Sequence, residues 1–267
     1  MKLAFSTLAC PAWDFEEIFS TAVDFGFDGI EIRGISNELY APRIKAFLDE
    51  NIDKTLSILS KRNMAISCLT SSACLADKGK IDSAIKEVKE YIDLAEKLRC
   101  RYVRVMSTGV PHRDEGDIEL CKTQYEEVCR YGEQRGVTPI METNAMFVDT
   151  KLLRDFMQSI GSENKGVLWD VNHPYRFNGE SAHETVENIG EFIKYVHIKD
   201  SIEKDGETVY KLLGYGDVPV KEAVKALRKR DFDGFMSLEW VKRWNKSLEE
   251  PYIVIPNYAG YMKALIQ

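Results

Sequence analysis

The stretch Val196-His197-Ile198-Lys199-Asp200 is a short apolar run that ends in a histidine, a lysine and an aspartate. Three other apolar runs of the chain end near acidic side chains, at Glu142, Asp170 and Glu239. The carboxyl ends of parallel strands meet at one edge of a sheet, and α/β enzymes build their sites at that edge. The four runs therefore predict strands of one sheet that share a cluster of ionisable side chains.

Working outward from these runs, apolar segments of strand length alternate with segments whose apolar residues repeat at helical spacing. The expected strands are 2–7, 29–34, 64–70, 102–107, 138–144, 166–172, 195–199 and 235–240. The expected helices lie within 14–25, 44–62, 81–98, 118–134, 150–160, 182–194, 218–230 and 252–266, with Asp149 or Thr150 as the cap of the fifth. This alternation, at intervals of roughly 30 residues, predicts that residues 1–267 form a single TIM-barrel domain, a (β/α)₈ α/β fold.

An open, doubly wound sheet is the alternative α/β arrangement. Its dinucleotide-binding form needs a glycine-rich turn after the first strand. The chain has Thr7-Leu8-Ala9-Cys10-Pro11 at that place, which favours the closed barrel.

Composition excludes several classes of function. The 267 residues are 44% hydrophobic and 30% charged, with a mean hydropathy of -0.30, and this is typical of a globular protein with a sizeable core. The net charge of -7 and pI of about 5.3 argue against a nucleic-acid partner. No run of 18 apolar residues indicates a membrane span, and the apolar start is too short for a signal peptide. Six cysteines without a Cys-x-x-Cys pair suit buried, reduced thiols in the cytoplasm.

Strand parity places the ionisable groups on one face, because successive side chains of a strand point to opposite sides. The charged positions share their parity with a few apolar ones, whereas the alternate positions are apolar throughout. The expected inward set is Ile140, Glu142, Asn144, Leu168, Asp170, Asn172, Tyr195, His197, Lys199, Ser237 and Glu239. The expected outward set is Met141, Trp169, Val171, Val196, Ile198, Leu238 and Trp240.

Several carboxylates buried together are strongly unfavourable unless a cation balances them. We therefore expect Glu142, Asp170, His197 and Glu239 to bind one divalent metal ion through three oxygen ligands and one nitrogen ligand. This ligand set favours Mn²⁺, Mg²⁺, Co²⁺ or Fe²⁺ and is also compatible with Zn²⁺. The alternative is four independent salt-bridged residues. It would need more cations than the inward Arg33, Arg104 and Lys199 supply.

An ordered set of motifs resembles the sugar phosphate isomerase/epimerase family of xylose isomerase-like barrels. The motifs are Phe27-Asp28-Gly29-Ile30-Glu31-Ile32-Arg33, Glu142-Thr143-Asn144, Asp170-Val171-Asn172-His173, His197-Ile198-Lys199-Asp200, Gly214-Tyr215-Gly216-Asp217-Val218-Pro219 and Ser237-Leu238-Glu239-Trp240. That family includes inosose dehydratases, inosose isomerases, ketose 3-epimerases and, more distantly, endonuclease IV. The resemblance implies that Glu142, Asp170, His197 and Glu239 are metal ligands. It also implies that His173 touches substrate and that Glu142 or Glu239 moves protons.

The chemistry of such a site fits an isomerase or epimerase of a ketose or keto-polyol. A metal that holds a carbonyl and an adjacent hydroxyl acidifies the C–H between them and stabilises the enediolate. Two carboxylates, Glu142 and Glu239, would then remove and return the proton. Lys199 or His173 would orient or protonate the substrate oxygen. A keto-polyol dehydratase is the runner-up, because the same enediolate can expel a β-hydroxyl group.

Other polar residues have less certain roles. Glu31 and Arg33 share inward parity, so both are candidate substrate-binding residues with Asn144, and Arg33 could hold a hydroxyl or a carboxylate. A structural pair across the barrel between Glu31 and an arginine, with Arg104 as a candidate, is equally compatible. His112 lies in a loop on the expected active-site side, and His183 opens a helix, where a structural role is favoured. Lys204, Lys211 and the loop 214–216 form a long connection that would suit a lid or a phosphate site.

Two further function classes remain. An endonuclease IV-like site would need additional histidines, but Cys68-Leu69-Thr70, Val105-Met106-Ser107 and Asp200-Ser201-Ile202 contain none. A non-catalytic sugar-binding barrel would leave the four expected ligands without a chemical role. Self-association as a homo-oligomer stays open, since no decisive interface stripe is visible in the sequence.

Overall fold

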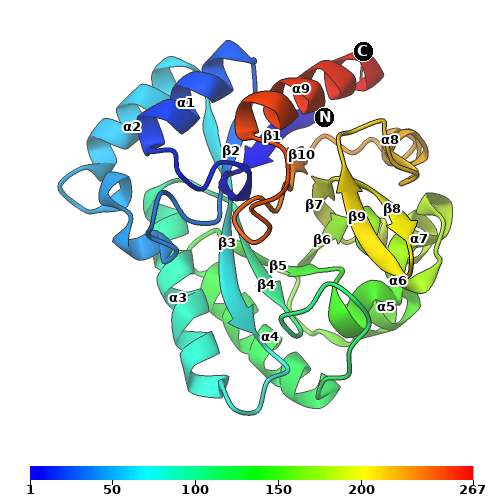
Figure 1. Cartoon of the computed structure of the whole chain (residues 1–267). Coiled ribbons are helices and arrows are strands. Elements are labelled where there is room, and N and C mark those ends of the chain that lie inside the picture. Colours follow the sequence, from blue (N-terminus) through cyan, green and yellow to red (C-terminus); the bar gives the residue numbers. More distant parts are fainter. Residues whose placement is uncertain (267) are drawn as a thin grey trace.

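A computed structural model describes residues 1–266, and it confirms the expected barrel. Eight parallel strands close in the order β1-β10-β7-β6-β5-β4-β3-β2, with helices around the outside (Figure 1). Closure comes from β10 against β1, where Lys2 pairs with Phe235 and Phe5 with Leu238. The strands are β1 (Lys2–Ser6), β2 (Gly29–Ile32), β3 (Ala65–Cys74), β4 (Tyr102–Met106), β5 (Thr138–Glu142), β6 (Gly166–Asp170), β7 (Ile193–Ile198) and β10 (Phe235–Leu238).

Four of the outer helices, α1, α4, α5 and α7, begin at a capping side chain. Asp14 with Glu17, and Ser181 with Glu184, form capping boxes at two of them. Asp149 caps the fifth, accepting from the backbone N–H groups of Lys151 and Leu152. The helices are α1 (Phe15–Asp24), α2 (Ile52–Lys61), α3 (Ile81–Lys97), α4 (Ile118–Glu133), α5 (Thr150–Ser159), α7 (Ala182–Ile189), α8 (Val220–Arg228) and α9 (Pro251–Ile266).

The segment 44–62 is helical only in its second part. Two 3₁₀ turns, η2 (Ala41–Arg43) and η3 (Lys45–Phe47), precede α2. Their buried side chains, Ala41, Ile44 and Phe47, recur every three residues. That spacing imitates one face of an α-helix, although Ile44 itself is extended between the two turns.

A short helix, α6 (Asn172–Asn178), follows β6 and was not expected from the sequence. The side chain of Asp170 accepts from the backbone N–H groups of Asn172 and His173, at 2.9 and 3.2 Å, and so supports the first turn. Pro174 in the first turn and Gly179 just beyond the end, at φ 67°, are the sequence signals that mark this helix.

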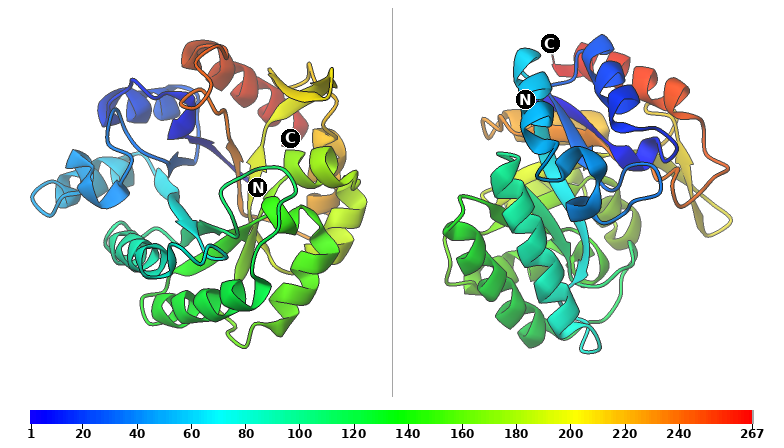
Figure 2. Two further views of the ribbon diagram at one scale, coloured as in Figure 1. Left: turned by 60° about the horizontal axis from the view of Figure 1, so that its bottom comes forward. Right: turned by 90° about the vertical axis from the view of Figure 1, so that its left-hand side faces the viewer.

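The connection after β7 contains a β-hairpin, β8 (Asp200–Lys204) and β9 (Glu207–Lys211), which pair only with each other. Asp205 and Gly206 at its tip both have positive φ, 54° and 79°. An Asp-Gly pair is a strong hairpin signal, because the turns that match strand twist need this conformation. The hairpin and the loop before α9 project from the same side of the barrel (Figure 2).

Burial follows the expected parity. Ile140, Leu168 and Tyr195 form a separate cluster with Cys68 inside the barrel, and the Tyr195 and Ser67 hydroxyl groups lie 2.8 Å apart. The outward set from Met141 to Trp240 belongs instead to the large core between strands and helices. The interior cluster fills the lower barrel, so the charged residues can gather only above it.

All six cysteines are buried and unpaired, as the sequence indicates. Within residues 1–266, none of the helices combines the length and the apolar character needed to cross a bilayer.

Candidate metal centre

The barrel brings the four expected ligands together. Asp170 at the end of β6 pairs in register with His197 on β7, and His197 pairs with Ser237 on β10, two residues before Glu239. Glu142 ends β5. All four side chains are buried, since each points inward above the apolar cluster.

His197 lies at the centre of three carboxylates. Its Nδ1 is 3.6 Å from Glu142 Oε1, 3.8 Å from Asp170 Oδ2 and 3.4 Å from Glu239 Oε1. This nitrogen is buried and has no hydrogen-bond partner among the described residues. An imidazole nitrogen aimed without a partner at three carboxylate oxygens is the geometry expected of a metal ligand.

The opposite nitrogen of His197 fixes the orientation of the ring. Nε2 lies 3.1 and 3.0 Å from the two carboxylate oxygens of Glu31, and Thr70 Oγ1 donates to Glu31 Oε1 at 3.0 Å. Metal-bound histidines commonly use their second nitrogen in this way. The structure therefore places Glu31 behind His197, and Glu31 does not line the cavity described below.

Lys199 is buried among the same groups. Its ammonium nitrogen is 2.6 Å from Asp170 Oδ2, forms an ion pair with Glu239 Oε2, and lies 3.0 Å from His173 Nε2. His173 Nδ1 is 3.2 Å from the Thr143 carbonyl oxygen. The carbonyl can only accept, so Nδ1 carries the proton and Nε2 accepts from the Lys199 ammonium. His173 is thus held as the neutral imidazole.

Neighbouring charges outweigh burial in setting the pKa values of Glu142, Glu239 and His197. Burial disfavours the charged form of Glu142, but Arg104 and His197 outweigh it and lower the pKa of Glu142 to about 2. Burial is likewise outweighed at Glu239, where Lys199 and His197 hold the pKa well below its usual value. For His197, burial opposes charge, yet Glu31 and Glu239 raise the pKa well above its ordinary value. Both glutamates are therefore ionised, which is the form that binds metals and accepts protons.

The donor set fits a divalent cation. Ligand atoms of Glu142, Asp170, His173 and Glu239 lie within 4.8 Å of one another, and Nδ1 of His197 faces three of these residues. Three carboxylates with one or two imidazole nitrogens match hard and borderline metals better than sulfur-seeking ones. Lys199 alone does not neutralise the carboxylates, which explains why a second cation would be favourable there.

A cavity of about 490 Å³ opens above this centre. Glu142, Glu239, His173 and Lys199 form its floor, whereas Asp170 and His197 are fully buried beneath. The other lining residues include Arg33, Arg104, Met106, Pro111, Asn144, Tyr210, Val241, Trp244 and Asn245. A small polyhydroxylated molecule would therefore meet carboxylates below and cationic and aromatic side chains at the sides.

Asp200 holds the loop that follows the hairpin. Its carboxylate accepts from the backbone N–H groups of Gly214, Gly216 and Val218, at 2.9, 2.9 and 3.2 Å. A Cβ added at Gly216 would lie only 2.0 Å from Asp200 Oδ1, so this approach requires glycine. The sequence motifs around Asp200 and Gly216 thus form one structural contact, the Asp200 lock, which holds this loop in place.

The remaining candidate residues divide between cavity and surface. Asn144 lines the cavity and donates to the Thr108 carbonyl oxygen at 3.0 Å. His112 is exposed in its loop, and His183 is exposed on α7, 3.4 Å from Glu187. Lys204 and Lys211 do not line the cavity, to which the hairpin contributes Tyr210. The sequence argument overlooked Tyr210 because it did not foresee the hairpin.

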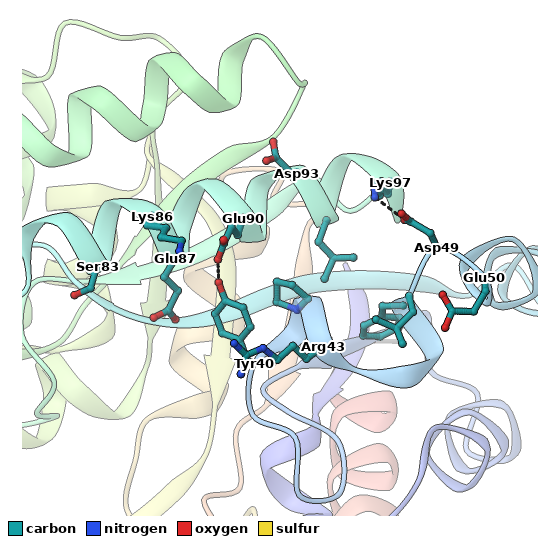
Figure 3. Close-up of a pocket in the computed structure, with 14 residues that line it drawn as sticks. Tyr40, Arg43, Asp49, Glu50, Ser83, Lys86, Glu87, Glu90, Asp93 and Lys97 are labelled. Atoms are coloured by element: carbon teal, nitrogen blue, oxygen red, sulfur yellow. Dashed lines mark hydrogen bonds and ion pairs between the residues drawn. The ribbon is translucent and has the colours of Figure 1, made fainter.

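A second hollow, of about 780 Å³, lies outside the barrel between α3 and the turns η2 and η3 (Figure 3). Tyr40 donates to Glu90, and Lys97 lies 2.6 Å from Asp49 (Figure 3). This hollow lies away from the cluster of carboxylates and histidines, so the candidate chemistry belongs to the barrel cavity.

Comparison with known proteins shows the family of the chain. The family described as "Xylose isomerase-like TIM barrel" matches residues 19–256. A fructoselysine 3-epimerase from Shigella flexneri is 21% identical over 281 residues, covering 100% of this chain and 98% of the relative.

Solved structures show the same fold. The IolI protein with a bound zinc atom has a TM-score of 0.80 at 18% identity, covering 100% of this chain and 98% of that one. A probable 3-DHS dehydratase, AsbF, from Bacillus anthracis has a TM-score of 0.77 at 18% identity, covering 100% and 99%. A D-psicose 3-epimerase from Clostridium cellulolyticum H10 has a TM-score of 0.79 at 16% identity, covering 100% of both chains.

Proposed function

Because the chain belongs to the xylose isomerase-like TIM barrel family, we propose that it is a divalent-metal-dependent isomerase or epimerase of a ketose or keto-polyol. The whole chain, 1–267, acts in this proposal as one domain with one site. The observation that carries it is the unpartnered Nδ1 of His197, 3.4–3.8 Å from oxygens of three carboxylates that end three other strands. The 3-epimerases among its relatives and structural neighbours support the choice of reaction.

Glu142, Asp170, His197 and Glu239 would hold the metal. When bound, a divalent cation polarises the carbonyl and adjacent hydroxyl of the substrate and acidifies the C–H between them.

Glu142 and Glu239 are the proton-transfer pair of this proposal. Each directs one oxygen toward His197 and the other toward a cation, Arg104 for Glu142 and Lys199 for Glu239. They reach the cavity floor from β5 and from beyond β10, which are separated in the barrel by β6 and β7. A proton removed by one carboxylate can therefore be returned from another side.

Lys199 and His173 would act on the substrate oxygen. The ammonium of Lys199 donates toward Nε2 of His173, and both residues line the cavity. A hydrogen-bonded pair with one transferable proton can stabilise a developing oxyanion and supply a proton to it.

Lys199 and His173 also support a dehydratase as the second candidate function. The Lys199 ammonium at the cavity floor can donate a hydrogen bond to a departing hydroxyl group, and a structural neighbour is named a probable dehydratase. In D₂O, deuterium exchange into substrate without loss of water favours isomerisation or epimerisation. A new enone absorbance favours dehydration.

Metal stoichiometry is the first test. Protein purified without chelator, and loaded with Mn²⁺, is expected to hold about one metal ion per chain. His197→Ala should lose it, whereas His183→Ala, which removes an exposed histidine, should keep it. About three zinc ions per chain would instead favour an endonuclease-like site, and absence of binding after loading would refute the proposal.

Glu239→Gln tests the proton transfer. In the Mn²⁺-loaded protein it should slow deuterium exchange on a panel of ketoses by roughly 10²–10⁴-fold. Glu133→Gln, an exposed change on α4, should leave the rate unchanged. Full turnover of metal-loaded Glu239→Gln would rule out the role given to this residue.

A further inference from the structure

Two arginines flank β3 at the side of the cavity. Arg33 directly follows β2, Arg104 lies on β4, and both line the cavity. Only 8% of Arg33 and 4% of Arg104 is exposed. Two guanidinium groups are therefore buried next to each other in a cavity suited to small molecules.

Several donors of these arginines have no acceptor in the described part of the chain. Nη2 of Arg33 donates to Ser72 Oγ at 2.8 Å, but its Nη1 has no partner, and neither Nε nor Nη1 of Arg104 has one. The carboxylate facing Arg104 is Glu142, at 3.4 Å from Nε, which is longer than a normal hydrogen bond. Buried donors without acceptors are costly and rare in folded proteins.

Another buried arginine of the barrel shows the contrast. Arg176 donates to the Ser201 carbonyl oxygen at 2.9 Å and to the Ser201 hydroxyl, and forms an ion pair with Asp217. Its Nε and Nη2 are thus both engaged by the fold itself. Arg33 and Arg104 lack such partners, and burial together with the neighbouring Arg104 charge lowers the pKa of Arg33.

The charge balance of the centre points the same way. Four buried carboxylates, Glu31, Glu142, Asp170 and Glu239, face three fixed cations, Arg33, Arg104 and Lys199. A divalent metal held by a neutral His197, as in the proposed function, would bring the sum of these charges to one net positive charge, which a neutral sugar would leave unbalanced.

We propose that the substrate of this site is anionic, and that Arg33 and Arg104 bind its oxyanion, a carboxylate or a phosphate, through the donors left free by the fold. Guanidinium groups present paired N–H donors that match these anions in geometry and charge. Arg104 is adjacent to Glu142, so the anion lies within a few bonds of the reacting carbons. This inference rests on the proposed function for the identity of the reacting carbons, but the anion site itself does not.

Binding to the Mn²⁺-loaded protein, measured by calorimetry, tests the inference with three probes. They are 5-keto-D-gluconate, which carries a carboxylate, D-fructose 6-phosphate, and neutral D-fructose. At least one acidic probe should bind about tenfold or more tightly than D-fructose, and which one does so distinguishes a carboxylate from a phosphate site. Arg33→Gln and Arg104→Gln should each remove most of this preference, whereas Arg62→Gln, an exposed change outside the cavity, should retain it.

Arg33→Lys and Arg104→Lys keep the charge without the paired donors, and should retain an intermediate preference. Thermal unfolding of each variant identifies those that fail to fold. The inference would be overturned if all three probes bind equally or if neither acid binds. It would also be overturned if the acid preference is unchanged in both folded glutamine variants.

Metal content and deuterium exchange of the same samples separate this inference from the proposed function. Exchange into D-fructose without acid preference would leave the isomerase or epimerase standing and remove the anion site. If acid binding depends on the arginines in a protein that neither holds a metal nor catalyses exchange, the anion site stands and the proposed function is refuted.

Discussion

The two sides of the cavity handle buried charge in opposite ways. On the acidic wall (Glu142, Asp170, His197, Lys199 and Glu239), nearly every charged atom faces a group of opposite charge within 4 Å. On the basic wall (Arg33, Ser72 and Arg104), two guanidinium groups have one hydroxyl group at 2.8 Å and one carboxylate oxygen at 3.4 Å. The charges of the acidic wall are therefore paired within the wall, to which a metal would be added, whereas the basic wall keeps several N–H donors without an acceptor among the described residues.

Removing a cation from the acidic wall should produce the largest effect. In Lys199→Met, Asp170 and Glu239 lose their shared ammonium and remain buried, so the metal-free protein should lose about 3–5 kcal/mol of unfolding free energy. Urea denaturation measures this loss, and saturating Mn²⁺ should recover part of it. Lys204→Met, on the exposed hairpin, is the control. A loss below about 1 kcal/mol would mean that the wall does not depend on internal pairing.

Metal binding should displace a proton from the same wall. The raised pKa of His197 keeps the imidazole protonated at neutral pH in the metal-free protein, and ligation needs the free Nδ1 lone pair. Metal uptake should therefore release about one proton, and affinity should fall by roughly tenfold for each pH unit below that pKa. Calorimetry in two buffers of different ionisation enthalpy counts the proton. His183→Ala should release as many; a count of zero in the unmodified chain would contradict the assigned protonation state.

The equivalent change on the basic wall should hardly alter stability. Arg33→Met removes a buried cation whose Nη1 has no acceptor, so the unfolding free energy should stay within about 1 kcal/mol of the unmodified protein or rise. The same denaturation experiment compares it directly with Lys199→Met. A loss as large as that of Lys199→Met would erase the difference between the walls.

The smallest effect concerns the aromatic rim. The Trp244 ring lies 5.5 Å from the guanidinium carbon of Arg33 and is 55% exposed. Trp244→Leu should weaken binding of the acidic probe by about two- to threefold, near 0.5 kcal/mol, and leave metal content unchanged. Altered metal content would show that the rim and the metal centre are not separable.

Much of this architecture could be predicted from the sequence, because strand parity and the ends of strands carry the information. Parity placed Leu168 inside and Trp169 outside, and the end of β6 placed Asp170 in the buried charged cluster beneath the cavity. The expected boundary at residue 44 was wrong because the helical pattern of Ile52, Leu56 and Leu59 belongs to α2, and 3₁₀ turns precede that helix.

The basic wall could be predicted only in part. Inward parity identified Arg33 as a candidate, but Glu31, for which a structural pair with an arginine was one of two expectations, hydrogen-bonds to His197. Whether Arg104 has an acceptor depends on distances between strands, here between β4 and the carboxylate at the end of β5. Local sequence does not encode those distances.

The hairpin β8–β9 has a consequence for the adaptability of this protein. It pairs with no strand of the barrel, contributes Tyr210 to the cavity, and is held at its base by the Asp200 lock. Its tip can lengthen, shorten or change composition while the eight-stranded scaffold stays intact. Changes in the hairpin can therefore alter which molecules the cavity accepts without altering the residues of the metal centre beneath it.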